Sequence, residues 1–347
     1  MSRLGIVIIG RNEGTRLTQC LESVLHSGHP IVYIDSGSVD GSPDLARAHR
    51  IQVIELDRST PFGAGRARNT GAALLAETYP AVEFVQFIDG DCTLDSQWLS
   101  SGVATLTSQP DVAVVCGRRR ERFPEASLYN RLCDLEWDAP TGEVTWCGGD
   151  ALMRLSAFQR VGGFNTTVKA GEEPELCNRL RAANWRILRI DADMTRHDAA
   201  ILRFGQWWKR QLRSGYGSLD LACRFRIASF RRFVLSAQSW TICWLIVCGL
   251  LAGAAAAYPS TWTYAAAGLW AILPLLQIVR IALRFRSKPN ASGKALWLAA
   301  LMVIGKWGET LGHLQYLRDR LAGRGVALIE YKQPAPAPTT PVAGVLR

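Results

Sequence analysis

Two long apolar stretches in the C-terminal half constrain the fold of this chain more than any other feature. Residues 234–257 contain no charged side chain, and residues 262–283 contain only Arg280, near their end. At 1.5 Å per residue, a helix over the first stretch would be about 36 Å long, which exceeds the roughly 30 Å of a bilayer's hydrocarbon core. We expect a transmembrane helical hairpin with a short turn between the stretches. A buried hairpin in a soluble protein is the alternative.

Basic residues flank this pair of stretches and are missing from the turn. Arg231 and Arg232 precede the first stretch, and Arg284 and Arg286 follow the second. Because the cytoplasmic flanks of membrane helices are enriched in Lys and Arg, both flanks are expected on the cytoplasmic side. The predicted location is therefore the cell inner membrane, crossed more than once, with the preceding domain in the cytoplasm.

The predicted membrane region covers residues 234–322, with a linker before it and a tail after it. Residues 218–233 are expected to form a basic juxtamembrane linker. Residues 294–322 are expected to form an amphipathic helix at the membrane interface, with a third full span as the alternative. Its apolar side chains recur at three- and four-residue steps: Trp307, Leu311, Leu314, Leu317 and Leu321. Residues 323–347 are expected to be a tail, proline-rich and disordered from about residue 333.

The N-terminal part alternates short apolar runs with helical patterns. The runs rich in β-branched residues are 4–9, 31–35, 51–56, 84–88 and 112–116, and the helical patterns are 17–25, 42–49 and 66–77. This alternation predicts an α/β fold with a mostly parallel sheet and helices on both faces. Residues 118–200 are less regular, apart from a helix expected at 172–183. The run 4–9 is too short for a signal-peptide core and is expected to be the first strand.

Charge and cysteine content narrow the class of protein. The net charge of +10 favours an acidic partner, such as a nucleotide, an anionic lipid or a nucleic acid. We expect no nucleic-acid partner, because the basic residues cluster next to the apolar stretches. The nine cysteines are scattered without a C-x-x-C pair, which indicates reduced thiols rather than a disulfide framework or a zinc site.

Carboxylates and amides follow three of the predicted strands. Asp89 and Asp91 come directly after the apolar run that ends at Ile88, and Asn12 and Asp35 follow the first and second runs. In parallel sheets, ligands bind beyond the carboxyl ends of the strands. Two carboxylates at that edge suit Mg²⁺ or Mn²⁺, with phosphate oxygens completing the ligand shell. Solvated turn residues are the alternative for the pair.

Several motifs together resemble family 2 glycosyltransferases, which use the GT-A fold. The resemblance spans about the first 217 residues, in the order that the family has, and predicts a catalytic domain at 1–217. Each motif alone is weak, whereas the ordered set is specific. The motifs are IVIIGRNE (6–13), IDSGSVDGS (34–42), GRARNTGA (65–72), FIDGD (87–91), GEEPELCNRL (171–180) and the basic, Trp-rich stretch near 206–217.

The resemblance assigns the first motifs to a nucleoside-diphosphate-sugar donor. Asn12 and Glu13 would line the nucleoside pocket, although Asn12 could instead cap a helix. Asp35 would bind the base and ribose, since a carboxylate accepts hydrogen bonds from both. Arg66 and Arg68 open a predicted helix, where a helix N-terminus and a guanidinium could face a phosphate. Ordinary surface arginines are the alternative.

The same resemblance implies a metal site. Asp91, the last residue of the Asp-Gly-Asp motif, would contact the divalent metal directly, and Asp89 would assist it and the donor. In some relatives a histidine at the position of His197 helps to bind metal or diphosphate. A loop histidine with a purely structural role is the alternative for His197.

The later motifs imply the chemistry. Asp150, in a glycine-rich segment, would bind hydroxyls of the donor sugar, with a structural turn as the alternative. Glu173 would be the catalytic base, because the role needs a carboxylate near the acceptor hydroxyl. The family usually has Glu-Asp where this chain has Glu172-Glu173, so the reach of the base is in doubt. Two acids favoured by a helix dipole are the alternative.

Arg213 lies in a stretch that resembles the family's Gln-x-x-Arg-Trp element. Arg210 replaces the Gln and Ser214 replaces the Trp, which argues against a processive, cellulose-synthase-like enzyme. Arg213 could clamp the diphosphate, or the basic residues could meet anionic lipid headgroups.

The sequence thus predicts an inverting, metal-dependent glycosyltransferase at the cytoplasmic face of the membrane. Its acceptor would be a lipid-linked sugar or a polysaccharide. A bare polyprenyl phosphate is the alternative acceptor; it hardly needs a base, so Glu173 favours a hydroxyl. A membrane-tethered protein that binds nucleotide sugars without turnover is the alternative of another class.

Overall fold

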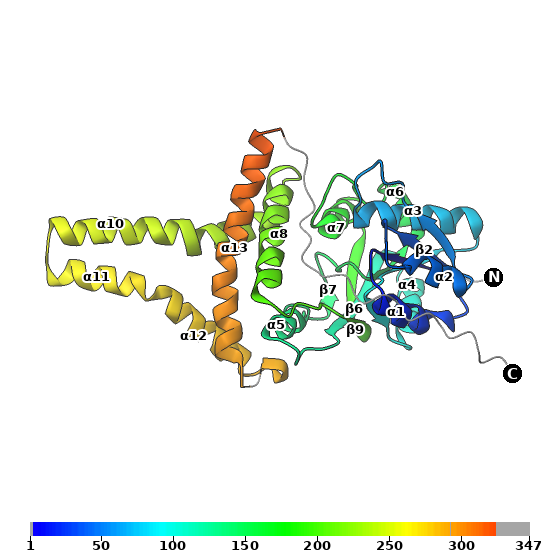
Figure 1. Ribbon diagram of the computed structural model, residues 1–347, viewed down its shortest axis with the longest axis horizontal. Helices are drawn as coiled ribbons and strands as arrows, with labels where there is room; N and C mark the ends of the chain where they lie inside the picture. Colours follow the sequence, from blue (N-terminus) through cyan, green and yellow to red (C-terminus); the bar gives the residue numbers. More distant parts are fainter. Residues whose placement is uncertain (1–2, 292, 324–347) are drawn as a thin grey trace. The chain divides into compact units, whose positions relative to one another are not determined.

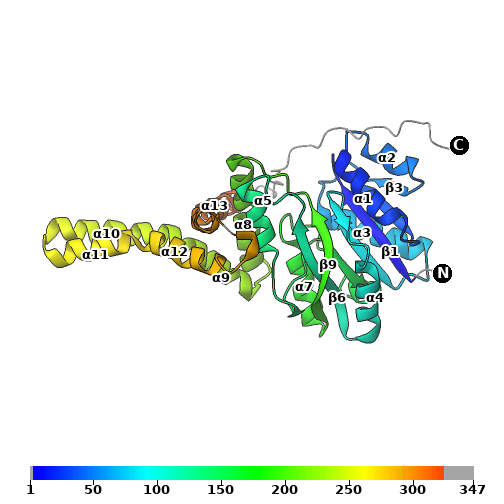
Figure 2. The ribbon, with the colours of Figure 1, turned by 90° about the horizontal axis from the view of Figure 1, so that it is seen from below.

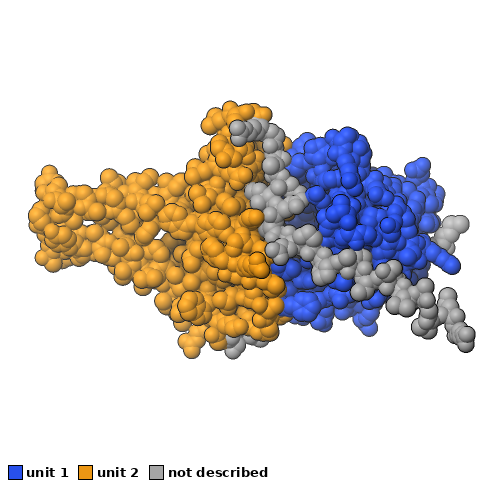
Figure 3. All heavy atoms as spheres, viewed as in Figure 1, with its two compact units in different colours: residues 1–123, 136–200, 332–347 blue, residues 124–135, 201–331 orange. Residues whose placement is uncertain are grey.

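The computed structural model describes residues 3–291 and 293–323, which fall into two compact units. Figure 3 colours the described residues of the first unit, 3–123 and 136–200, blue, and those of the second, 124–135, 201–291 and 293–323, orange. The first unit thus ends at residue 200, whereas the predicted catalytic domain runs to residue 217. The predicted domain boundaries stay a prediction, and the expected tail at 323–347 lies almost wholly outside the described residues.

The first unit is an α/β sheet domain, and the five predicted strands are all present. The strands are β1 (Leu4–Gly10), β2 (Ile31–Asp35), β3 (Gln52–Glu55), β4 (Phe84–Asp89), β5 (Cys92–Leu94), β6 (Val112–Glu121), β7 (Gly142–Glu143), β8 (Ala151–Arg154) and β9 (Arg186–His197). The helices are α1 (Thr15–Leu25), α2 (Ser42–Ala48), α3 (Ala64–Thr78), α4 (Trp98–Ser108), α6 (Leu155–Arg160) and α7 (Glu172–Ala182). The class predicted from the alternation is therefore confirmed as α/β.

The order of the first four parallel strands reverses at one point of the sheet. They lie in the order β3-β2-β1-β4, so the chain reverses its direction across the sheet between β3 and β4. Right-handed crossovers then place α1 and α2 on one face and α3 on the opposite face (Figure 1, Figure 2). The carboxyl ends of β1 and β4 meet where the order reverses, and ligands bind at such points.

The second half of the sheet corrects the prediction of a mostly parallel arrangement. β8 pairs antiparallel with both β4 and β6, β5 and β7 pair antiparallel with β9, and β6 runs parallel to β9. The sheet is mixed because β8 lies between β4 and β6 and runs antiparallel to both. The strand β9 was not predicted, since its side chains are half-exposed and lack the apolar run that marks the first strands.

The core of this unit lies on both faces of the sheet. The apolar side chains of β1, β2 and β4 are almost fully buried, as expected for strands covered on two sides. Gly71 of α3 faces Val7 of β1 so closely that a Cβ would collide with the valine methyls. This contact fixes α3, and thereby its first turn, against the carboxyl half of the sheet.

The second unit is helical. Its helices are α5 (Leu128–Glu136), α8 (Phe204–Cys223), α9 (Ala228–Gln238), α10 (Trp244–Ala257), α11 (Thr261–Ala271), α12 (Leu273–Phe285) and α13 (Ala295–Leu321), with a π-helical turn at Ser239–Cys243 and a 3-10 turn at Pro289–Ala291. α8 packs against α13 through glycines: a Cβ on Gly215 would collide with the backbone of Glu309, and one on Gly312 with the backbone of Leu212.

The predicted amphipathic helix at 294–322 is present as α13. Its buried face includes Gly308, His313 and Tyr316, whereas the predicted apolar stripe is largely exposed. The exposed members of the stripe are Leu311, Leu314, Leu317 and Leu321. Packing within the described part of the chain therefore does not bury this stripe.

The first predicted span has the length and composition of a membrane helix. α9, the π-helical turn and α10 run on as one helix of 30 residues, Ala228–Ala257, and an 18-residue stretch within it has a mean hydropathy of 2.0 and is 11% buried. By the same criteria it is the one such unbroken helix among the described residues. Length and composition thus support one candidate span, and the transmembrane hairpin itself is not confirmed.

The second predicted span is not one straight helix. α11 and α12 bend by 41° at Ile272, just before Pro274. Proline has no N–H to donate to the carbonyl of Trp270, four residues earlier. That carbonyl instead accepts a hydrogen bond of 3.2 Å from the Trp244 indole, and the Trp270 indole donates to the Trp244 carbonyl at 3.2 Å. This reciprocal pair joins α10 to α11.

Candidate active site

The carboxyl ends of the paired strands β1 and β4 bring together segments far apart in the sequence. Ile9 pairs with Asp89 across the two strands, and the Gly90 N–H donates to the Ile9 carbonyl at 2.8 Å. The loop after β1 and the Asp-Gly-Asp segment after β4 are therefore neighbours. This arrangement agrees with the predicted grouping of polar side chains at one edge of the sheet.

Asp35 and Asn12 build the loops after β2 and β1. Asp35 is fully buried and accepts hydrogen bonds from the backbone N–H groups of Gly37 and Ser38, at 2.8 and 2.7 Å. Asn12, in a left-handed conformation with φ of 56°, accepts from the Val39 N–H at 2.8 Å. Both predicted donor-binding residues thus shape the loops in which they lie. Neither is an N-cap of α1, which begins after Gly14.

Glu13 and Arg66 are held by local partners. Glu13 pairs with Arg16 on α1 at 2.9 Å, so it stays close to the β1 loop. Arg66, on the first turn of α3, donates to the backbone carbonyls of Asp57 and Thr60, both at 2.9 Å. Arg66 therefore fixes the loop that leads into α3.

A buried ion network lies beside the Asp-Gly-Asp segment. Arg68 donates to Asp89 at 2.7 Å and to Glu172 at 3.2 Å, and Arg119 contacts Asp89 at 3.4 Å. Burial alone would lower the pKa of Arg68, but the carboxylates around it raise that pKa above its ordinary value. Asp89 is thus held by two arginines that remain charged.

Asp150, in the loop just before β8, anchors this network. It is fully buried, accepts from the Asp89 N–H at 3.0 Å and from the Thr195 hydroxyl at 2.9 Å, and pairs with Arg119 at 2.7 Å. Burial by itself would raise the pKa of Asp150, but Arg119 and the Asp89 N–H outweigh it, so the pKa lies below its ordinary value. The neighbouring Gly149 leaves room for the network, because a Cβ there would lie 2.9 Å from Nη2 of Arg68.

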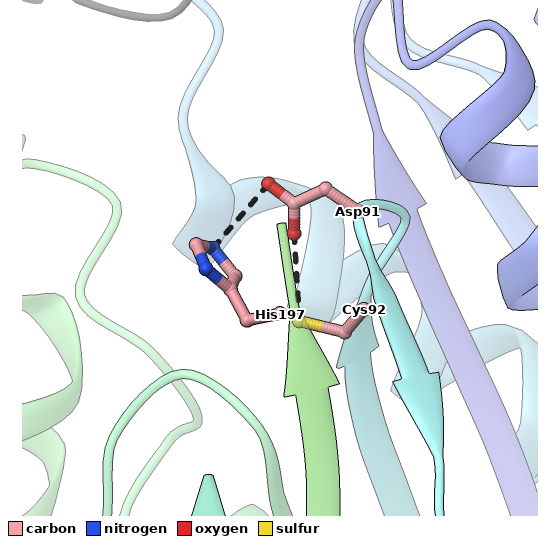
Figure 4. A group of neighbouring side chains, drawn as sticks. All are labelled: Asp91, Cys92 and His197. Carbon is pink, nitrogen blue, oxygen red and sulfur yellow. Dashed lines mark hydrogen bonds and ion pairs between the residues drawn. The ribbon is translucent and has the colours of Figure 1, made fainter. Parts of the chain in front are cut away.

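Asp91, Cys92 and His197 form a buried group that could hold a metal ion (Figure 4). Nε2 of His197 lies 3.5 Å from Oδ2 of Asp91, and Nδ1 of the same ring lies 3.7 Å from Oε2 of Glu121. A carboxylate behind a histidine ring is a common way to orient a metal-binding imidazole. The pairing of β5 and β6 with β9 brings these residues together.

Glu173 lies at the start of α7, and its side chain points into the protein. It is 5% exposed, and Oε1 accepts from the Cys147 N–H at 2.5 Å and from the Cys177 thiol at 3.1 Å. Glu172, its neighbour, faces the ion network instead. The two acids of this motif therefore lie in different surroundings.

Arg213 belongs to α8, in the second unit. Three residues of the site were not predicted from the sequence: Arg119, Cys92 and Glu121. Arg119 and Glu121 lie on β6 beyond its apolar part. Their partners lie just before β8 and on β9, two strands that were not predicted. The run of three arginines, 118–120, at the end of a predicted strand was the only local signal.

Sequence comparisons identify the family. Residues 5–156 match Glycosyl transferase family 2, and residues 84–279 match Glycosyl transferase family group 2. Glycosyltransferase AglE of Haloferax volcanii is 25% identical over 246 residues, which cover 67% of this chain and 78% of that protein. The pre-mycofactocin glycosyltransferase of Mycobacterium tuberculosis is 30% identical over 233 residues, 63% of this chain and 47% of that protein.

A structural comparison supports the GT-A fold. The mannosyltransferase PcManGT of Pyrobaculum calidifontis, solved with GDP-Man and Mn²⁺, aligns with a TM-score of 0.58 at 18% identity, covering 90% of this chain and 87% of that one. At this identity the likeness concerns the fold alone. Since the match to family group 2 covers more than half of the residues, the chain belongs to Glycosyl transferase family group 2 and is a glycosyltransferase.

Proposed function

We propose that this protein is an inverting, metal-dependent glycosyltransferase that takes its sugar from a nucleoside-diphosphate-sugar. The observation that carries the proposal is the Asp91–His197 pair beside the Asp89 ion network, at the edge where β1 and β4 meet. A carboxylate, an imidazole and fixed arginines at such an edge suit a diphosphate with its counter-ion.

Asp91 and His197 would hold the divalent metal, Mg²⁺ or Mn²⁺. The site fits such an ion, because Asp91 offers a carboxylate oxygen opposite Nε2 of an imidazole whose other nitrogen faces Glu121. When bound, the ion would offset the negative charge that develops on the leaving diphosphate. Asp89 is occupied by Arg68 and Arg119, so we assign it to positioning the donor rather than to the first ligand shell.

The nucleoside would lie over the loops of β1 and β2. Asn12, Glu13 and Asp35 shape those loops and hold them rigid before the donor arrives, which lowers the entropic cost of binding. Arg66 would fix the adjacent loop, and Arg68 and Asp150 would orient Asp89 toward the sugar. The role of Arg213, which lies on α8 in the second unit, as a clamp for the diphosphate stays a prediction from the sequence.

Glu173 would act as the general base. Among the described residues, both hydrogen bonds to its side chain end on Oε1, which leaves Oε2 to accept the proton of the acceptor hydroxyl. The oxygen so activated would attack the anomeric carbon from the side opposite the diphosphate, which inverts the configuration. The loss of such a base typically costs about 100- to 10,000-fold in rate.

The acceptor would be a lipid-linked sugar or a saccharide at the cytoplasmic face of the cell inner membrane. The candidate span at Ala228–Ala257 and the exposed apolar stripe of α13 support contact with membrane lipids. With the bent pair α11–α12 as a second crossing, the protein would be a multi-pass protein. A polyprenyl phosphate is the second candidate acceptor.

A donor and acceptor screen tests this proposal. Detergent-purified protein with Mn²⁺ or Mg²⁺ would be offered UDP-, GDP- and dTDP-sugars, with and without membrane lipid extract, and the released nucleoside diphosphate measured. We expect release from one donor, stimulated by the extract. If no donor is turned over with extract present, the proposal is wrong. The alternative is then a protein that binds nucleotide sugars without catalysis.

A further inference from the structure

A second group of potential metal ligands lies next to the candidate base. Sγ of Cys147 is 3.7 Å from Sγ of Cys177, and Sγ of Cys177 is 3.1 Å from Oε1 of Glu173. The three ligand atoms lie within 4.8 Å of one another, and all three residues are buried. Glu173 and Cys177 are four residues apart on α7 and share one helix face, while Cys147 comes from the loop before β8.

The spacing of the two sulfurs suits one tetrahedral ion. Two thiolates bound to the same Zn²⁺ at about 2.3 Å lie roughly 3.7–3.8 Å apart when the angle between them is tetrahedral. A carboxylate oxygen is a regular third ligand of zinc, and thiolates select soft cations over Mg²⁺. The set therefore differs in kind from the carboxylate–imidazole pair at Asp91.

Burial of the two thiols disfavours their direct oxidation but still allows a soft cation to bind them. Burial raises the pKa of Cys147 well above its ordinary value and raises that of Cys177 to about 11, so both are protonated at neutral pH. Buried, protonated thiols react slowly with oxidants. A soft cation can displace both thiol protons, so that binding converts two thiols to thiolates and releases two protons per ion.

We propose that Cys147, Cys177 and Glu173 form a site for a soft divalent cation of the Zn²⁺ class. An ion bound there holds the Glu173 carboxylate and withdraws it from proton transfer, so zinc inhibits the enzyme. The binding site stands on the geometry of the three residues. The inhibition rests in addition on the proposed role of Glu173 as the base.

The test uses Cd²⁺, whose bonds to thiolates give an ultraviolet charge-transfer band. The parent protein, in detergent and stripped of metal, carries Cys223→Ser, Cys243→Ser and Cys248→Ser, which removes the three thiols that are not buried, and Cys92→Ser, which removes the thiol of the Asp91–His197 group. We expect a band that saturates at one Cd²⁺ per chain, with two protons released. Cys147→Ser or Cys177→Ser should abolish the band, whereas Cys133→Ser, at a buried thiol of α5, should leave it unchanged.

Two outcomes would overturn the site: no saturable band in the parent, or a band that persists in both cysteine variants. Circular dichroism and gel filtration check that each variant folds. If a serine variant fails to fold, Glu173→Gln replaces it, with an expected loss in Cd²⁺ affinity of at least tenfold, and unchanged affinity counts against the site. Cd²⁺ binding without any glycosyl transfer would refute the proposed function alone, and transfer without a band would refute the metal site alone.

Discussion

At the scale of single residues, the ion network around Asp89 shows how the protein holds a polar site rigid before substrate binds. Arg68 is buried and Arg119 is partly buried, and both have carboxylate partners from other elements. A buried charge is costly unless its partners and hydrogen bonds are complete. The network therefore fixes Asp89 in one position. It depends most on Asp150, which accepts hydrogen bonds from several donors at once.

Asp150→Asn should destabilise the fold strongly. The amide leaves the partly buried Arg119 without its shortest ion pair at a fully buried position, so we expect a loss of about 3–5 kcal/mol in the free energy of unfolding, measured by urea denaturation. Asp111→Asn is the matched control, since Asp111 pairs with Arg186 at the exposed surface and such pairs contribute about 0–1 kcal/mol. Equal effects of the two substitutions would contradict the account.

The same carboxylate predicts a pH dependence. The pKa of Asp150 is lowered in the folded protein, so its contribution to stability is complete above the ordinary carboxyl pKa of about 4 and is lost as the pH falls toward the lowered value. Asp150→Asn should therefore lose less stability than the parent between about pH 5 and pH 3. Parallel stability profiles in acid urea titrations would show that another group carries this dependence.

The sequence predicted several of these residues but not their partners. Asp91 and His197 were both named, although they lie more than a hundred positions apart, because Asp91 stands in a motif and some relatives in the resembling family have a histidine at the position of His197. Cys92, Glu121 and Arg119 were not, because nothing in their local sequence shows that β5 and β6 pair with β9. Strand register is a long-range property, and it decides which side chains meet.

At the scale of elements, the close packing of α8 on α13 depends on glycines. Gly215 and Gly312 allow the two backbones to approach, since a Cβ at either position would meet backbone atoms of the other helix. Backbone atoms cannot move aside as flexible side chains do. The exposed stripe of α13 lies elsewhere on the helix, so packing and lipid contact can use separate faces.

Gly215→Ala should separate the two helices. We expect a loss of about 1–3 kcal/mol, the usual cost of overpacking, seen as a lower thermal midpoint in detergent. Gly205→Ala, in the same helix but with nothing near its Cβ, should be neutral or slightly stabilising, because alanine favours a helix over glycine by about 0.5–1 kcal/mol. A stable Gly215→Ala variant would show that the contact is not tight.

The elements also show where apolar patterns mislead. Residues 262–283 read as one span, but Pro274 removes a backbone donor and the helix bends there. The apolar content of a stretch does not indicate such a bend, whereas a proline within the stretch does. The strand β8 was missed because its apolar run is only three residues long, and β9 was missed because polar side chains interrupt its apolar residues.

At the scale of the whole molecule, the proposed function requires that helices of the second unit anchor the protein in the membrane. If Ala228–Ala257 and the bent pair α11–α12 both cross the bilayer, Ser260 lies outside the cytoplasm and Ser287 inside it. In a background without Cys223, Cys243 and Cys248, an impermeant thiol reagent should label Ser260→Cys in intact cells and Ser287→Cys only after permeabilisation. Labelling of both positions only after permeabilisation would refute the hairpin.

The central claim is that Asp91 and Glu173 serve one metal-dependent sugar transfer, and nucleoside-diphosphate release by the purified protein tests it most directly. With Mn²⁺ and the active donor, Asp91→Ala and Glu173→Gln should each lower the rate by at least about 100-fold, while Asp44→Ala, at an exposed ion pair, should not. EDTA should abolish the release. Release that survives EDTA, or that persists in both variants, would contradict the account.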